Sequence, residues 1–346
     1  MTLFFFSNFH VGGAQKIAIN LINSLNKKED IFNEIIAINN SGPLKKNISN
    51  LIKINNFNKK KLIYCVFKYI KYVKKNNVDK IFCVQPHSVI FCYFMNFLLN
   101  KKIKIIARET NSYKKSIYRQ FSLKEKIFLV FKNFVYKKIH LVICPSRGLK
   151  NEVKGRKKFI SNFVDIRFLK KKKTKKKEGN YLLGVGRLVK QKRFQDLIYA
   201  FNLIHDEIKE KLIIIGEGPE KTKLDKLIKK LNLKKKITIL PFQNYLKYLA
   251  NCKVFVSTSA WEGMPNMLIE AVVLEKRIVA TNCNHGPKEI LLNGKYGHLC
   301  KVGDINEISN KISKQLKSKR IKVTDRFTSR FSMDYALKEY YQIFKK

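Results

Sequence analysis

The stretch Trp261-Glu-Gly-Met-Pro-Asn-Met-Leu-Ile-Glu270 lies between two short runs of β-forming residues, 253–257 and 276–281. Proline is tolerated in the first turn of a helix, and good helix formers continue through Glu275, so we expect a helix that begins at Pro265. A strand, a loop, a helix and a second strand in this order form a βαβ unit, whose two strands are parallel.

The same stretch places one carboxylate on each side of the expected helix start. Glu262 falls in the preceding loop, Gly263 leaves room for a ligand near the backbone, and Glu270 lies about a turn inside the helix. The first N–H groups of a helix have no partner within it and attract anions. The pattern favours a polyhydroxylated anionic ligand such as a sugar nucleotide. An amphipathic helix with solvated glutamates is the alternative.

Short β-rich runs alternate with longer helical patterns along all 346 residues, a length that favours two domains over a single core. The lysine-rich run 170–179 is typical of a linker or exposed loop and places the boundary near 165–178. Two doubly wound domains, with ligand sites at the carboxyl ends of parallel strands, predict a cleft between them. The expected strands are 2–7, 34–38, 79–84, 103–107 and 140–144, then 181–186, 211–215, 236–240, 253–257 and 276–281.

The formal net charge of +47, carried almost entirely by lysine, would usually indicate nucleic acid or an anionic membrane as a partner. Lysine together with abundant Asn and Ile also fits the codon bias of an AT-rich genome. We find no nucleic-acid-binding motif, so we expect no nucleic acid partner. Segments 59–75 and 113–138 combine lysines with apolar residues at helical spacing. Such helices either lie on an anionic bilayer or pack their apolar stripe on a sheet.

The seven cysteines are scattered without a C-x-x-C pair, which favours buried, reduced thiols in the cytoplasm over disulfides or a zinc site. No basic residue precedes the short apolar run Leu3–Phe6, so we expect no signal peptide. The apolar segment 81–99 is interrupted by polar residues and is better explained by a strand, a loop and a buried helix than by a membrane span.

Two features of the first half lie at expected strand ends. The pair Gly12-Gly13 follows strand 2–7 and permits close approach of a phosphate to a helix start. It lacks the G-x-G-x-x-G spacing of dinucleotide enzymes, which counts against a dehydrogenase. His87 stands at the equivalent place after strand 79–84, where a functional and a structural role are equally plausible.

The second half opens with Gly184-Val-Gly-Arg-Leu-Val-Lys-Gln-Lys192, in which Arg187 and Lys192 follow a strand. A planar guanidinium and a flexible ammonium there suit the binding of a diphosphate without a metal, although plain surface charge is the alternative. Gly216-Glu-Gly-Pro219 forms a sharp turn where a flat base fits against the backbone, and His285-Gly-Pro-Lys-Glu-Ile-Leu supplies another turn at a strand end.

In this order the motifs resemble those of the retaining glycosyltransferases of family 4, which have the GT-B fold: two Rossmann-like, doubly wound parallel-sheet domains that face a central cleft. The resemblance covers most of the chain and is most specific over residues 181–304. It implies an acceptor-side domain over 1–165, a nucleotide-sugar-binding domain over 166–330, and a final helix over 331–346 that crosses back to the first domain.

The resemblance also implies roles for individual residues. Arg187 and Lys192 would bind the donor diphosphate, which Gly12 and Gly13 would approach. Glu270 would bind the ribose hydroxyls, and Glu262 with the amides after it the donor sugar. His87 would meet the sugar near the reacting carbon. The catalytic residues would be Glu262, His87, Arg187 and Lys192, and the remaining donor-binding positions would be Gly216, Gly263, Met264, Pro265 and Asn266.

We therefore expect a retaining glycosyltransferase that moves a hexose or N-acetylhexosamine from a nucleotide sugar, with UDP as the carrier, to a hydroxyl of a lipid-linked or envelope glycan. Lipopolysaccharide, capsule and O-antigen are such glycans. We expect a cytoplasmic enzyme, peripheral on the inner face of the cell membrane. No Asp-x-Asp pair stands at a strand end, so we expect no metal cofactor. The alternatives are another GT-B enzyme, such as a sugar-nucleotide epimerase or phosphorylase, or a basic nucleic-acid-binding protein.

Overall fold

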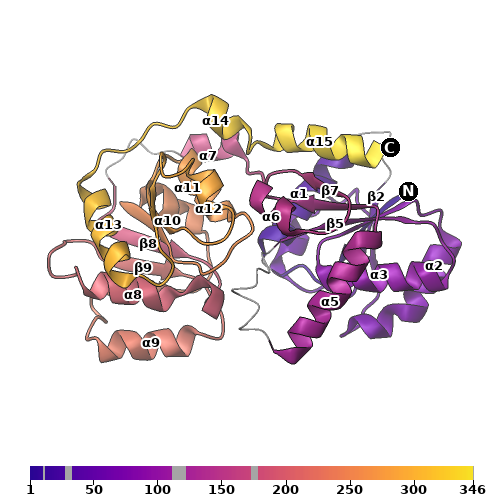
Figure 1. Ribbon diagram of the computed structural model, residues 1–346, viewed down its shortest axis with the longest axis horizontal. Helices are drawn as coiled ribbons and strands as arrows, with labels where there is room; N and C mark the ends of the chain where they lie inside the picture. Colours follow the sequence, from indigo (N-terminus) through magenta and orange to yellow (C-terminus); the bar gives the residue numbers. More distant parts are fainter. Residues whose placement is uncertain (11, 28–32, 111–121, 173–177, 346) are drawn as a thin grey trace. The chain divides into compact units, whose positions relative to one another are not determined.

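The computed structural model describes residues 1–10, 12–27, 33–110, 122–172 and 178–345. They form two compact units, which we describe separately: Met1–Phe163 with Asp334–Lys346, and Val164–Met333. The sequence-based boundaries stood at 165 and 330. Both units are built on parallel sheets covered by helices, so the predicted doubly wound α/β class is confirmed (Figure 1).

The first unit contains a seven-stranded parallel sheet in the order β3-β2-β1-β4-β5-β6-β7. The strands are β1 (Thr2–Phe6), β2 (Asn33–Ala37), β3 (Ile54–Asn56), β4 (Lys80–Cys83), β5 (Lys104–Arg108), β6 (Leu141–Cys144) and β7 (Lys157–Phe159). Its α-helices are α1 (Gly13–Leu25), α2 (Val66–Lys75), α3 (Pro86–Leu98), α5 (Leu123–Lys138), α6 (Arg147–Glu152) and α15 (Met333–Lys345). The central strand β1 is buried along its whole length because it pairs on both sides and is covered on both faces.

The second unit contains a six-stranded parallel sheet in the order β10-β9-β8-β11-β12-β13. The strands are β8 (Tyr181–Val185), β9 (Lys211–Ile215), β10 (Ile237–Leu240), β11 (Val254–Ser257), β12 (Arg277–Thr281) and β13 (His298–Cys300). Its α-helices are α7 (Ile166–Lys172), α8 (Phe194–Asn202), α9 (Lys221–Lys230), α10 (Tyr245–Asn251), α11 (Asn266–Val273), α12 (Pro287–Ile290), α13 (Ile305–Lys317) and α14 (Asp325–Ser329). Two apolar clusters fill this unit, one on each face of its sheet.

The ten predicted strands are present, but the prediction missed β3, β7 and β13. All three are edge strands of three residues, and most of their side chains are only half-buried. An edge strand of this kind lacks the continuous apolar run that marks a central parallel strand. The predicted helix, which continued through Glu275, is also longer than the observed one. Helix α11 ends at Val273, and Glu275 has a left-handed φ of 52° that turns the chain toward β12.

All seven cysteines are free and buried, as the sequence predicted. The apolar segment 81–99 forms β4 and α3, as predicted, but α3 is buried on one face only: Val89 and Cys92 are buried, whereas Phe97 and Leu98 are exposed. Among the described residues, no helix combines the length and the apolar character that crossing a bilayer requires.

The C-terminal helix α15, yellow in Figure 1, packs on the first unit. The ring of Phe344 lies 5.6 Å from that of Phe4 and 5.8 Å from that of Phe82. The guanidinium of Arg108, 1% exposed, donates hydrogen bonds to the hydroxyl of Tyr340 and to the side-chain oxygen of Asn162. The helix therefore supplies both apolar area and a hydrogen-bond acceptor to the core of the first unit.

We expect Tyr340→Phe to lower the free energy of unfolding by about 1–3 kcal/mol, because a buried guanidinium would lose an acceptor that water cannot replace. Urea denaturation followed by circular dichroism measures the effect. The matched control is Tyr64→Phe, which removes the hydroxyl of an exposed tyrosine and should change little. Equal urea midpoints for the two variants would contradict the role of Tyr340.

Candidate active site

The strand order of the second unit reverses at β8, which pairs with β9 on one side and β11 on the other. Open parallel sheets bind ligands at such a switch point, beyond the carboxyl ends of the strands. The loop after β8 carries Arg187 and Lys192, the turn after β9 carries Gly216, and the loop after β11 carries Glu262. The structure thus brings Arg187, Lys192, Gly216 and Glu262 to the carboxyl ends of neighbouring strands of one sheet, whereas Gly12 and Gly13 belong to the first unit.

Lys192 and Glu262 form an ion pair between these loops, with side chains 17% and 9% exposed. Hydrogen bonds surround the pair. The side-chain amide of Gln191 donates to the carbonyl of Trp261 at 2.7 Å, and the Thr258 hydroxyl donates to the carbonyl of Lys192 at 2.9 Å. The sequence analysis assigned Lys192 and Glu262 to different parts of a ligand. Their contact is a tertiary feature that it did not anticipate.

Gly216 has a packing role in this edge. A Cβ atom built there would lie 1.8 Å from the carbonyl oxygen of Gly186, because the turns after β8 and β9 cross in contact. The backbone N–H of Leu188 donates to the carbonyl of Glu217 at 2.7 Å and fixes the crossing. Glycine is therefore required at 216 for the loop geometry, whatever ligand lies beside it.

The turn at His285-Gly286 packs against the segment from Glu262 to Asn266. Gly286 has a φ of 82°, and a Cβ atom on it would lie 2.7 Å from the ring of Pro265. Gly263 and Met264 are buried, whereas Pro265 and Asn266 are half-buried. Pro265 is the N-cap of α11, which begins one residue later than expected, at Asn266.

Glu270 is 3% exposed, and the hydroxyl of Tyr245 donates to its carboxylate at 2.9 Å from Oε2 and 3.2 Å from Oε1. Burial and then the charge of Glu270 raise the pKa of the Tyr245 phenol, so this group stays a donor. The sequence analysis missed Tyr245. Its position at the start of a helix that follows a strand was the available signal, but contact between α10 and α11 depends on the tertiary fold.

Arg187 is exposed, and among the described residues no side-chain partner is found for its guanidinium. It differs in this respect from Lys192, five positions further along the same loop. A cation without a protein partner at a switch point remains available to an anionic ligand.

The first unit has its own switch point, between β2 and β4 on either side of β1. His87 follows β4, and its Nε2 lies 2.9 Å from the hydroxyl of Ser7, which follows β1. Desolvation lowers the pKa of the His87 imidazole, which favours its neutral form. Gly12 and Gly13 begin α1 beyond the same strand. The contact of Ser7 with His87 was not anticipated from the sequence.

Two compact parallel-sheet units, each with polar side chains at its switch point, match the GT-B architecture. The family model described as glycosyl transferases group 1 matches residues 165–330. An uncharacterised glycosyltransferase of Methanocaldococcus jannaschii is 30% identical over 281 residues, which cover 70% of this chain and 68% of the relative. The chain belongs to the glycosyltransferases of group 1.

A second relative is the N-acetylgalactosamine-N,N'-diacetylbacillosaminyl-diphospho-undecaprenol 4-alpha-N-acetylgalactosaminyltransferase of Campylobacter jejuni. It is 28% identical over 278 residues, covering 76% of this chain and 73% of the relative. Among solved structures, Anabaena HepE in complex with UDP and glucose is similar with a TM-score of 0.81, at 17% identity and with 99% and 98% of the two chains covered. These likenesses confirm the predicted GT-B fold.

We expect Lys192→Met to lower the free energy of unfolding by roughly 3 kcal/mol, because it leaves the Glu262 carboxylate buried without its counter-charge. The double variant Lys192→Met/Glu262→Gln removes both charges and should recover most of this loss. Lys190→Met is the matched control, since Lys190 is exposed in the same loop. Denaturant titration measures all of these variants. A double variant as unstable as the single one would show that the charge pair is not the cause.

Proposed function

We propose that this glycosyltransferase moves a hexose or N-acetylhexosamine from a UDP-sugar to a hydroxyl of a lipid-linked or envelope glycan, with retention of configuration. The observation that carries the proposal is the buried Glu270 carboxylate, which accepts hydrogen bonds from Tyr245 through both oxygens. Glu270 lies on α11, the helix that follows the loop carrying the Lys192–Glu262 pair. This arrangement suits a nucleoside diphosphate: a carboxylate for ribose hydroxyls and cations for the diphosphate.

The similar proteins of Campylobacter jejuni and Anabaena support the substrate class. The name of the Campylobacter relative specifies an N-acetylgalactosaminyl transfer and a diphospho-undecaprenol-linked substrate, and the Anabaena structure holds UDP and glucose. We infer that this chain uses a donor and an acceptor of the same kinds. We place the enzyme in the cytoplasm, on the inner face of the membrane that carries such an acceptor.

In the proposed reaction, the bond between the anomeric carbon and the diphosphate breaks while the acceptor hydroxyl bonds to the same face of that carbon. The acceptor proton passes to the leaving diphosphate. Arg187 and Lys192 stabilise the developing charge, and Lys192 has N–H donors left after pairing with Glu262. Glu262 and the backbone from Gly263 through Asn266 orient the sugar, so the protein contributes mainly positioning and electrostatics.

Residues of the first unit complete the proposed roles. We propose that the Gly12-Gly13 turn at the start of α1 accepts the diphosphate and that His87 donates or accepts a hydrogen bond near the reacting carbon. We propose that no metal is needed, because two side-chain cations supply the positive charge. Incubation of donor with and without acceptor separates this transferase from an epimerase or a phosphorylase.

We expect Glu270→Ala to weaken UDP binding more than about tenfold, since each charge-assisted hydrogen bond to a ribose hydroxyl contributes about 1.5–3 kcal/mol. Calorimetry with UDP and with 2',3'-dideoxy-UDP tests the assignment directly. The wild type should prefer UDP, and the variant should bind both ligands equally. Tyr245→Phe, which keeps the carboxylate, should weaken UDP binding less, and the exposed Glu207→Ala should not change it. A variant that still prefers UDP would contradict the role of Glu270.

We expect transfer to survive EDTA, because the proposed reaction needs no metal. We expect Arg187→Ala to lower kcat by about a hundredfold without loss of stability, because the exposed guanidinium would act on charge that develops in the transition state. Arg326→Ala, also on an exposed arginine, is the matched control. Steady-state kinetics with the donor found by screening UDP- and GDP-sugars provides the measurement. Activity that EDTA abolishes and a divalent cation restores would overturn the metal-free proposal.

A further inference from the structure

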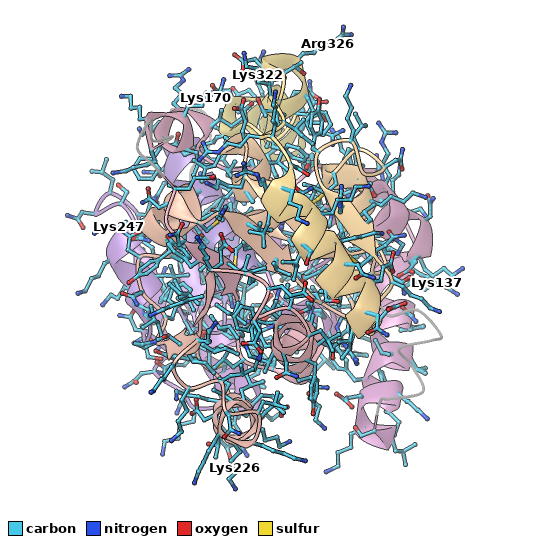
Figure 2. All side chains as sticks on the ribbon, turned by 90° about the vertical axis from the view of Figure 1, so that its left-hand side faces the viewer. Lys137, Lys170, Lys226, Lys247, Lys322 and Arg326 are labelled. Carbon is cyan, nitrogen blue, oxygen red and sulfur yellow. The ribbon has the colours of Figure 1, made fainter. Side chains whose placement is uncertain are left out.

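Positive charge alone does not select an interaction surface on this protein. Lysines and arginines extend outward from elements of both units, as the labelled side chains of Figure 2 illustrate. Exposed apolar side chains are distributed much less evenly, and eight large ones lie on two neighbouring helices of the first unit. We call them the α3–α5 apolar surface: Phe94, Phe97 and Leu98 on α3, and Leu123, Ile127, Val130, Phe131 and Phe134 on α5.

Helices α3 and α5 lie side by side (Figure 1), and the ring of Tyr93 contacts that of Phe134 at 6.4 Å. Other residues of the same helices, Val89 and Val135 among them, are fully buried in the core. The two helices therefore carry apolar side chains on their outer face in addition to their inner one. Phe97 is 75% exposed, Leu123 73% and Val130 64%.

This finding changes the interpretation of segment 113–138, of which residues 113–121 lie outside the described part of the chain. The sequence suggested one apolar stripe containing Ile127, Phe128, Phe131, Phe134 and Val135. In the structure Val135 is buried and Phe128 is half-buried, whereas Ile127, Phe131 and Phe134 are exposed. The predicted apolar stripe is therefore only partly buried, because some of its side chains suffice to cover the core.

Contacts at the start of α5 and on its inner face fix its orientation. Ser122 and Glu125 form a capping box: the Ser122 hydroxyl accepts from the backbone of Glu125, whose carboxylate accepts from the backbone of Ser122. On the inner face, Lys132 forms an ion pair with Glu109, with both side chains at most 4% exposed. Rotating the helix to bury its outer apolar residues would break this pair, so their exposure is stable.

Lysines flank the apolar surface. Lys124, Lys137 and Lys138 are exposed on α5, and Lys101 and Lys102 follow α3. Glu125 is the only acidic residue within α5. An exposed apolar surface bordered by cations complements the interface of an anionic bilayer, where apolar side chains enter the acyl region and lysines meet the headgroups.

We propose that the α3–α5 apolar surface inserts into the interface of an anionic bilayer. The inference deepens the proposed function, since it names the surface through which the enzyme reaches a membrane-bound acceptor, but the binding itself needs neither donor nor acceptor. Lysine attraction weakens as salt is added, whereas insertion of apolar side chains does not. Part of the binding should therefore persist at high salt.

The test replaces three outer residues of α5 by glutamine: Leu123→Gln, Ile127→Gln and Phe131→Gln together. The charge stays the same and all three positions are exposed, so the fold should tolerate the change. The matched control carries Tyr199→Gln, Leu203→Gln and Ile321→Gln, three exposed apolar residues of the second unit. Flotation with phosphatidylglycerol-containing and pure phosphatidylcholine vesicles measures partitioning at low and high salt.

We expect the α5 triple variant to lose more than about tenfold of its partitioning to anionic vesicles, and the control to bind like the wild type. Lys137→Gln/Lys138→Gln should reduce binding to anionic vesicles and leave the high-salt fraction unchanged. Phe131→Trp gives a direct readout of depth, because brominated acyl chains quench only an inserted indole. The wild type, whose single tryptophan is Trp261 in the second unit, supplies the background.

Flotation of the triple variant at wild-type level, or no quenching of Phe131→Trp, would overturn the inference. A dimer in sedimentation velocity that the triple variant abolishes, with no vesicle binding by either protein, would assign the surface to a second copy and also overturn it. UDP calorimetry on the same samples keeps the two proposals apart. Loss of flotation with unchanged UDP affinity supports the inference. A wild type that floats but binds no UDP refutes the proposed donor alone.

Discussion

The buried ion pair of Lys192 and Glu262 joins the loops that leave β8 and β11, the two strands that flank the switch point of the second unit. Other contacts between neighbouring loops lie beside this ion pair. Gln191 reaches the backbone of Trp261, and the turn at Gly286 supports Pro265 from below. A pair that is nearly buried resists opening, because either charge left alone would be strongly destabilising. The ion pair thereby holds the two loops together at the carboxyl ends of β8 and β11.

The scarcity of acidic residues explains how such pairs coexist with the large net charge. The chain has 25 Asp and Glu against 72 Lys and Arg, yet several carboxylates are buried beside cations. Glu178 alone contacts Lys276, Arg277 and Arg320, and these contacts keep the pKa of its carboxyl low despite burial. Some of the few acids thus neutralise cations in the interior. The excess lysine is left on the surface, where its distribution over both units says little about partners.

Most of the fold could be predicted because central parallel strands are buried on both faces and appear as continuous apolar runs, such as Leu3–Phe6. Edge strands such as β7 lack that signal, since their side chains are half-buried. The candidate site could be predicted in part for a similar local reason. Strand ends, glycine turns and charged residues are visible in sequence, so Arg187, Glu262 and Glu270 could be proposed as candidates. Tyr245 and Ser7 could not, because their partners lie far away along the chain.

The sequence by itself determined the alternation of strands and helices and the placement of glycines and charges at strand ends, which depend on neighbours within a few residues. The length of the chain indicated two domains. Only the tertiary structure decided which side chains meet: Lys192 with Glu262, Tyr245 with Glu270, and Lys132 with Glu109. It also decided which apolar residues of α5 face the core and which face water. The physical reason is that helical spacing gives a residue an angular position on its helix, whereas burial depends on how much of that helix the sheet and its neighbours can cover.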